Sequence, residues 1–170
     1  MQREFSFPLK IDELGQGEQN YSLRADKEQL DWLKEILQVP AVNSFSAKMK
    51  LNFQKKKGLL NITGRVQANI GLISVISLEE FNKEYMADFS INYDTNAKYD
   101  DIYQDDEDIN LDIPDIVMDG KIDLGDIAIE QIALVLEDHP RKEGEIFDSV
   151  IEDDTSVNNN PFAILAKLKK

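Results

Sequence analysis

Residues 45–72 read FSAKMKLNFQKKKGLLNITGRVQANIGL, and this stretch decides the fold. Apolar side chains occupy alternate positions before the turn and again after it: Phe45, Ala47, Met49, Leu51 and Phe53, then Leu60, Ile62, Val66, Ala68, Ile70 and Leu72. A period of two is typical of strands with one buried and one solvated face. Lys55-Lys56-Lys57-Gly58 supplies the turn, so the stretch predicts a long antiparallel hairpin, with Gly64 as a candidate β-bulge.

Further alternation on both sides of the hairpin extends the predicted sheet. Every second residue from Phe81 to Tyr93 suits a third long strand, in which Lys83 is the polar exception. Near the N-terminus, Phe5, Phe7, Leu9 and Ile11 alternate with polar residues and Pro8, which favours an edge strand. A short strand is expected around Tyr21 and Leu23. Strands of this length predict a strongly twisted sheet or a partial barrel.

Two main helices and one short helix complete an α+β fold. Asp26 suits a helix N-cap with Gln29 three residues on, and the apolar stripe that follows ends before Pro40: Leu30, Leu33, Ile36 and Leu37. A second helix is expected from Asp123 or Asp126 to Pro140, and it has almost no polar face, so it should lie buried on the sheet. Asn160 and Pro161 predict the start of a short C-terminal helix that ends at Leu168.

Charge is distributed unevenly along the chain. The whole chain has a formal net charge of −14. Residues 93–157 hold 4 basic and 21 acidic side chains, whereas residues 158–170 hold 3 basic ones and no acidic one. We therefore expect a single α+β domain over 1–157, which includes an acidic loop over 94–120 and a polar linker over 141–160, followed by a basic tail over 158–170.

Several functional classes find no support in the sequence. The chain has no cysteine, which excludes disulfides and thiolate chemistry and suits a reducing compartment. It has no apolar run long enough for a bilayer and no signal-peptide pattern, so a soluble cytoplasmic protein without a membrane partner is expected. Phosphate-loop, nucleophile-elbow and metalloprotease motifs are missing too. We expect no catalytic residue, no cofactor and no metal site.

Basic residues cluster on the predicted hairpin and suit phosphate contacts. Lys48 and Lys50 share its solvated face, Lys55, Lys56 and Lys57 form its tip, and Arg65 lies on the return strand. Such side chains can each hold one nucleic-acid phosphate. The alternative interpretation is that they only keep the sheet soluble and block edge pairing.

The basic tail combines apolar and cationic residues, and it is a candidate docking segment: Pro161, Phe162, Leu165, Lys167, Leu168 and Lys169. It is too short to be a stable helix alone. Two interpretations stay open, in which the tail docks on a partner or folds back on its own body.

Two stretches resemble one known family. Residues 159–170, NNPFAILAKLKK, are similar to the NPFAxLxxLK ending of YceD-type proteins, the large ribosomal RNA subunit accumulation proteins. Residues 120–140 resemble the block with Ile-Asp-Leu and a closing proline in the same family, and the order of elements upstream is similar. Many members carry a C-x-x-C pair where this chain has Ser74 and Ser77, so a thiolate metal or redox role cannot apply here.

The resemblance implies a non-enzymatic role in large ribosomal subunit biogenesis. The implied partners are large-subunit ribosomal RNA or a pre-ribosomal particle. An alternative follows from the acidic segment, which repels RNA and attracts lysine-rich chains. Under that alternative the protein is a chaperone or adaptor for a basic ribosomal protein.

Overall fold

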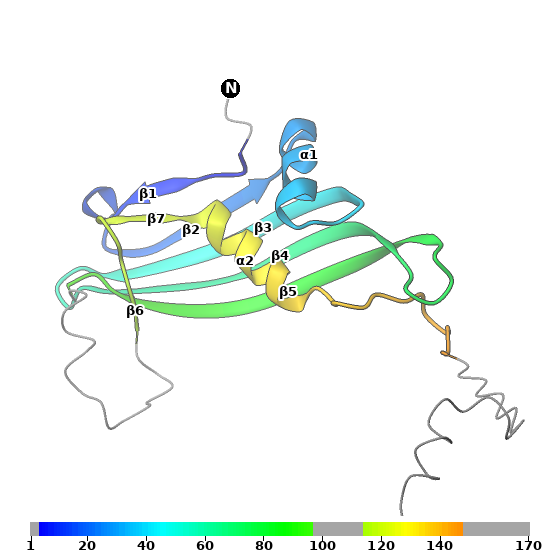
Figure 1. The fold of residues 1–170 in the computed structure, drawn as a ribbon. Helices are drawn as coiled ribbons and strands as arrows, with labels where there is room; N and C mark the ends of the chain where they lie inside the picture. Colours follow the sequence, from blue (N-terminus) through cyan, green and yellow to red (C-terminus); the bar gives the residue numbers. More distant parts are fainter. Residues whose placement is uncertain (1–3, 97–113, 148–170) are drawn as a thin grey trace, which may run out of the picture.

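The computed structural model describes residues 4–96 and 114–147, which form a five-stranded sheet, a two-stranded sheet and two α-helices (Figure 1). The larger sheet has the strand order β2-β3-β4-β5-β6, with β2 at Gly17–Arg24, β3 at Ala41–Gln54, β4 at Leu59–Ile73, β5 at Glu80–Asp94 and β6 at Asp115–Ile116. Strands β2 to β5 are antiparallel, and β6 runs parallel to β5. Because β2 and β6 are not paired, this sheet is open and does not close into a barrel.

The β3–β4 hairpin forms the centre of the sheet, as the alternation predicts. The apolar residues predicted to face inward on both strands are buried, and Ile62, Val66, Ala68 and Ile70 are fully inaccessible. The turn closes with Gly58 at a φ of 68°, a backbone conformation that glycine adopts without strain. Burial of this face supplies the main hydrophobic stabilisation of the described fold.

Gly64 does not form a bulge, so that prediction was wrong. The β3–β4 register runs through Met49 and Gly64 without a shift, and the irregularity falls between Val42 and Ser44. Glycine is needed at position 64 for space, because a Cβ there would lie 2.7 Å from the carbonyl oxygen of Lys48 and 2.9 Å from the ring of Phe89. The aromatic ring of the neighbouring strand covers the place that a side chain would fill.

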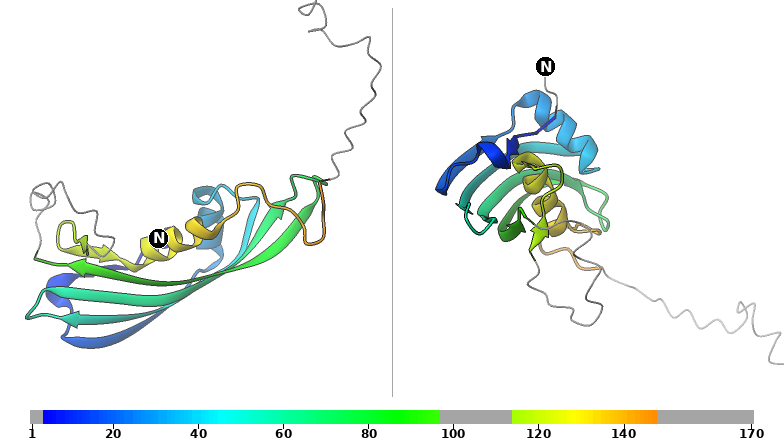
Figure 2. Two further views of the ribbon diagram at one scale, coloured as in Figure 1. Left: turned by 90° about the horizontal axis from the view of Figure 1, so that it is seen from below. Right: turned by 90° about the vertical axis from the view of Figure 1, so that its left-hand side faces the viewer.

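Both α-helices lie on one face of the larger sheet, and its other face is open to solvent (Figure 2). Helix α1, Lys27–Ile36, starts with the predicted capping box between Asp26 and Gln29 and packs on β3. Helix α2, Leu124–Val135, packs on β4 and β5 and starts at Asp123, one of its two predicted caps. The helix lies on the sheet as predicted, and its residues Ile127, Ala128 and Ile132 are buried. It ends five residues before Pro140, and Leu134 is 72% exposed, so the helix is not buried on all sides.

The predicted N-terminal strand is shorter than its alternation indicates. Strand β1 covers only Pro8–Lys10 and pairs with β7, Lys121–Asp123, outside the larger sheet. The 3₁₀ helix η1, Ile11–Glu13, follows at once. Phe5 is buried with its ring against Phe45, whereas Phe7 is exposed and its ring contacts Tyr21. The backbone N–H of Phe7 donates to the side chain of Asp123, the last residue of β7.

The predicted acidic loop and linker are partly structured. Strands β6 and β7 lie inside 94–120 and at its border, where no strand was expected, and Val117 packs against the core. Residues 141–147 lie beside the connection between β4 and β5. There Lys142 pairs with Glu79, and the hydroxyl of Ser74 donates to Glu145. The rest of the predicted acidic loop, most of the linker and the short C-terminal helix lie outside the described residues.

Candidate nucleic-acid interface

The open face of the sheet holds three of the six predicted basic residues. Lys48 lies directly opposite Arg65 in the β3–β4 register, and Lys50 lies one step nearer the turn on the same face. All three side chains are exposed. The structure therefore brings these cations together, as the alternation predicts, and we call this surface, with its neighbours Arg24, Asn61 and Thr63, the basic face.

The three tip lysines extend the basic face at one end. Lys55, Lys56 and Lys57 follow β3 directly in the turn and are exposed. The turn is fixed because the N–H of Lys57 donates to the carbonyl of Gln54, at 3.0 Å. The tip thus presents its charges from a defined backbone.

Arg24 also belongs to the basic face, although the alternation along the chain does not indicate it. It ends β2, which pairs with β3 so that Arg24 lies opposite Ser46, two residues from Lys48. A surface depression of about 600 Å³ is lined by the three cations Arg24, Lys48 and Arg65 and by one acid, Glu84, together with polar residues that include Ser22, Ser46 and Gln67. The β2–β3 register creates this cluster, and a short strand without a clear turn does not reveal its register in the sequence.

Rows of amide side chains cross the same face. Asn52, Asn61 and Asn92 are aligned across three strands, and the Asn61 amide donates to Asn92 at 2.7 Å. Nearer the other end of the sheet, Asn43 donates to Asn69 at 2.7 Å. Amide and hydroxyl groups on an open sheet can bond phosphate and sugar oxygens, so the face offers neutral contacts beside the charged ones.

Acidic residues of β5 and β2 limit the positive charge of the basic face. Arg65 binds Asp88 through two of its nitrogens, with 2.8 Å between Nη2 and Oδ2. This hydrogen bond is the main cause that lowers the pKa of Asp88 and raises the pKa of Arg65. Lys50 pairs with Glu18 at 3.2 Å. A polyanion would have to compete with these exposed pairs, which are weak in water.

Ser74 has a structural role at the start of the β4–β5 connection, together with Ser77. Ser74 is fully buried, and its hydroxyl accepts from the N–H groups of Ile76 and Ser77 at 3.2 and 3.3 Å while it donates to Glu145. The hydrogen bond from the Ser74 hydroxyl, followed by one from the Ser77 side chain, lowers the pKa of Glu145. Among the described residues no three acidic or histidine side chains are grouped so that they could hold a metal ion.

The chain belongs to the family of large ribosomal RNA subunit accumulation protein YceD, whose model matches residues 62–169. This confirms the family resemblance. The match includes Arg65 and the whole predicted docking segment, whereas Lys48, Lys50 and the tip lysines precede it. No curated protein and no solved structure matches the chain. Within the described residues, neither helix is long and apolar enough to cross a membrane.

Proposed function

We propose that this protein supports the accumulation of large-subunit ribosomal RNA by binding RNA phosphates on the basic face and the hairpin tip, without catalysing a reaction. The family's name supports the process. The observation that carries the molecular role is the open sheet face, on which Arg24, Lys48 and Arg65 surround one depression. In this proposal the protein acts in the cytoplasm, on ribosomal RNA or a pre-ribosomal particle.

The number of available cations predicts a moderate, salt-sensitive affinity. Four basic side chains on the face and three at the tip give up to seven phosphate contacts, of which two start in exposed ion pairs. Each phosphate contact to single-stranded nucleic acid contributes roughly 0.7 to the slope of log K against log salt. Binding should therefore weaken strongly between 50 and 200 mM salt.

Charge reversal at the tip tests the site. The variant Lys55→Glu/Lys56→Glu/Lys57→Glu should bind large-subunit ribosomal RNA at least tenfold more weakly, with a salt slope reduced by about 2. The matched control is Lys27→Glu/Lys34→Glu/Lys121→Glu, which makes the same charge change on α1 and β7, away from the basic face. If both variants lose RNA affinity equally, the effect comes from net charge alone. If the tip variant binds RNA with unchanged affinity, the hairpin tip is not part of the binding site.

A second candidate function rests on the acidic row beside the basic face. Glu80, Glu84 and Asp88 lie four residues apart on the exposed side of β5, with Asn82 and Met86 between them. Such a row can attract a lysine-rich ribosomal protein. Capture from lysate at two salt concentrations separates the two functions: ribosomal RNA that survives protease supports RNA binding, whereas a basic ribosomal protein that survives nuclease supports the chaperone.

A further inference from the structure

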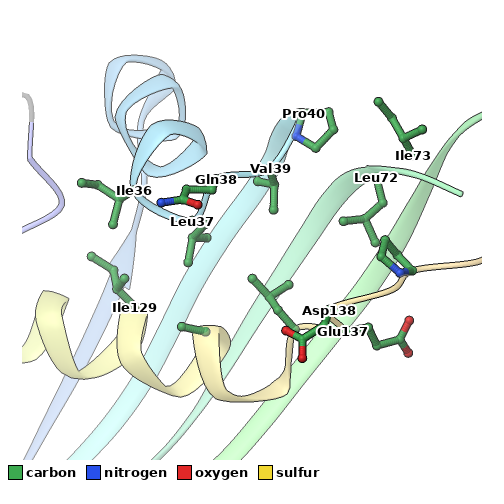
Figure 3. Close-up of a pocket in the computed structure, with 13 residues that line it drawn as sticks. Ile36, Leu37, Gln38, Val39, Pro40, Leu72, Ile73, Ile129, Glu137 and Asp138 are labelled. Atoms are coloured by element: carbon green, nitrogen blue, oxygen red, sulfur yellow. The ribbon is translucent and has the colours of Figure 1, made fainter. Parts of the chain in front are cut away.

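A groove lies between the C-terminal ends of the two helices, on the face of the sheet opposite the basic face (Figure 3). Its volume is about 540 Å³. Its walls are mainly aliphatic, from the end of α1, the turn into β3, the end of β4 and the last turns of α2: Ile36, Leu37, Val39, Leu72, Ile73, Ile129, Ala133 and Leu136. We call it the interhelix groove.

The interhelix groove exposes apolar side chains that the rest of the fold does not cover. Ile36 is 50% and Ile73 42% exposed, although the sequence places Ile36 on the buried stripe of α1. These two residues come from different elements and line the same groove. An apolar groove of this kind favours an occupant with several aliphatic or aromatic side chains.

The groove is negative as well as apolar. The C-cap residues of both helices, Leu37 and Leu136, line it, so the negative ends of two helix dipoles converge there. Helix α1 has Lys34 in its last turn, whereas helix α2 has no basic residue there, so the dipole of α2 is the one left without a nearby cation on its own helix. Glu137 and Asp138 also line the groove, and Lys83 offsets only the first of them through an ion pair. A cationic occupant is therefore favoured over an acidic one.

One segment of this chain has the matching composition. Residues 161–170, PFAILAKLKK, contain four large apolar or aromatic side chains, three lysines and no acid. Phe162, Leu165 and Leu168 recur every third residue, a spacing that suits one face of a helix. Residues 97–113 and 148–160 also lie outside the described structure, but both are acidic. Charge complementarity therefore selects 161–170 among these segments.

The last described residues bring the chain close to the groove. Glu145 is bonded to Ser74, which directly follows the groove residue Ile73, and the N–H of Val75 donates to the carbonyl of the groove residue Pro140. Residues 148–160 then connect Phe147 to Pro161. Thirteen residues can span up to about 45 Å when extended, so the connection does not prevent return to the groove.

We propose that residues 161–170 bind the interhelix groove of the same chain, with Phe162, Leu165 and Leu168 against its aliphatic walls and the lysines toward Glu137 and Asp138. The bound segment covers Ile36 and Ile73. Because the connection is short, the effective concentration of the segment is in the millimolar range, and a weak contact suffices to keep it bound. This proposal does not depend on RNA binding.

Disulfide trapping in the full-length chain tests the proposal, because the natural chain has no cysteine. The pair Ile36→Cys/Leu165→Cys joins the groove to the segment. The control pair Leu59→Cys/Leu165→Cys uses an exposed apolar residue at the turn of the β3–β4 hairpin. Under mild oxidation at low protein concentration, the groove pair should form an intramolecular disulfide at least tenfold faster than the control pair.

A third variant tests the chemistry of the groove. Adding Ile73→Lys to the groove pair places a cation against the lysines of the segment and should slow trapping at least fivefold. Equal trapping rates for the groove and control pairs would overturn the proposal. A disulfide dimer that predominates and increases with protein concentration would also overturn it, since it would assign the groove to the segment of a second copy.

Discussion

Arg65 and Asp88 form a bidentate pair on an exposed sheet face, so the contribution of each to binding depends on the other. In the free protein, Asp88 already accepts hydrogen bonds from the guanidinium group of Arg65. An exposed pair contributes little to stability, but it occupies the guanidinium geometry that a phosphate would use. Replacement of the acid should therefore reveal the binding capacity of the arginine.

The variant Asp88→Asn should bind large-subunit ribosomal RNA about three to tenfold more tightly at 50 mM salt. It frees Arg65 and removes a charge that repels phosphates. Filter binding measures the change, with Asp31→Asn on α1 as a control of equal charge. Weaker binding to a basic ribosomal protein, with unchanged RNA affinity, would favour the chaperone function instead.

The pairing of Arg65 with Asp88 also predicts how the stability of the fold depends on pH. The hydrogen bond from Arg65, followed by the charge of Arg65, holds the pKa of Asp88 below its ordinary value of 3.8. Because the folded-state pKa is lowered, the stabilisation is present above pH 3.8 and is lost as pH falls through the lowered pKa. Carbon-13 NMR of the Asp88 carboxyl group should show a higher midpoint in Arg65→Gln. Identical midpoints would contradict the assigned cause.

The start of α2 joins three segments through one carboxylate. Asp123 accepts from the N–H groups of Gly125 and Asp126 in the helix, from the N–H of Phe7, and from the hydroxyl of Ser6. The same residue ends β7. Its side chain thus positions the helix, the small sheet and the N-terminal segment together.

Asp123→Ala should lower the free energy of unfolding by about 2–3 kcal/mol, because it removes a helix cap and leaves several N–H groups without an acceptor. Urea denaturation measures the loss. Asp31→Ala, at an exposed position within α1, should change stability by less than about 0.5 kcal/mol. Similar losses in both variants would mean that the cap network has no special role.

Gly125, the second residue of α2, is packed so closely against the N-terminal segment that a larger residue should destabilise the fold. A Cβ on Gly125 would lie 2.1 Å from the carbonyl oxygen of Phe5, so Gly125→Ala should destabilise the fold by about 2 kcal/mol or more. Gly15→Ala is the control, since its Cβ would meet only the mobile end of the Gln19 side chain. Thermal unfolding of both variants measures the difference. If Gly125→Ala is as stable as the natural protein, the N-terminal segment at Phe5 can shift away from α2 at little cost.

Periodicity predicted the long strands because each presents one face to the core and one to water, and the capping pattern predicted α1. The short strands β6 and β7 contain too few residues for a period, and their partners are distant in sequence. For the site, alternation placed Lys48, Lys50 and Arg65 on one face. It could not reveal Arg24 or Asp88, since both depend on the pairing register, which tertiary structure sets.

We expect the β1–β7 sheet to unfold locally while the larger sheet stays folded. The β1–β7 sheet has three residue pairs, whereas the β3–β4 ladder is long and backed by the core. In native-state hydrogen exchange, the N–H groups of Leu9 and Ile122 should exchange well before those of Ile62 and Val66. Asp123→Ala should accelerate the first pair and lower protection of the second only by its global destabilisation. Uniform protection would indicate one cooperative unit.

The pairing of Leu9 with Ile122 also determines when the protein can finish folding during its own synthesis. At ~5–20 residues per second, β7 leaves the peptidyl-transferase centre roughly 6–23 s after β1. The hairpin strands can pair in that interval, whereas the N-terminal segment must wait. A nascent chain therefore cannot form the β1–β7 sheet until translation has passed residue 123, and throughout this interval the backbone of residues 8–10 remains accessible to chaperones and proteases.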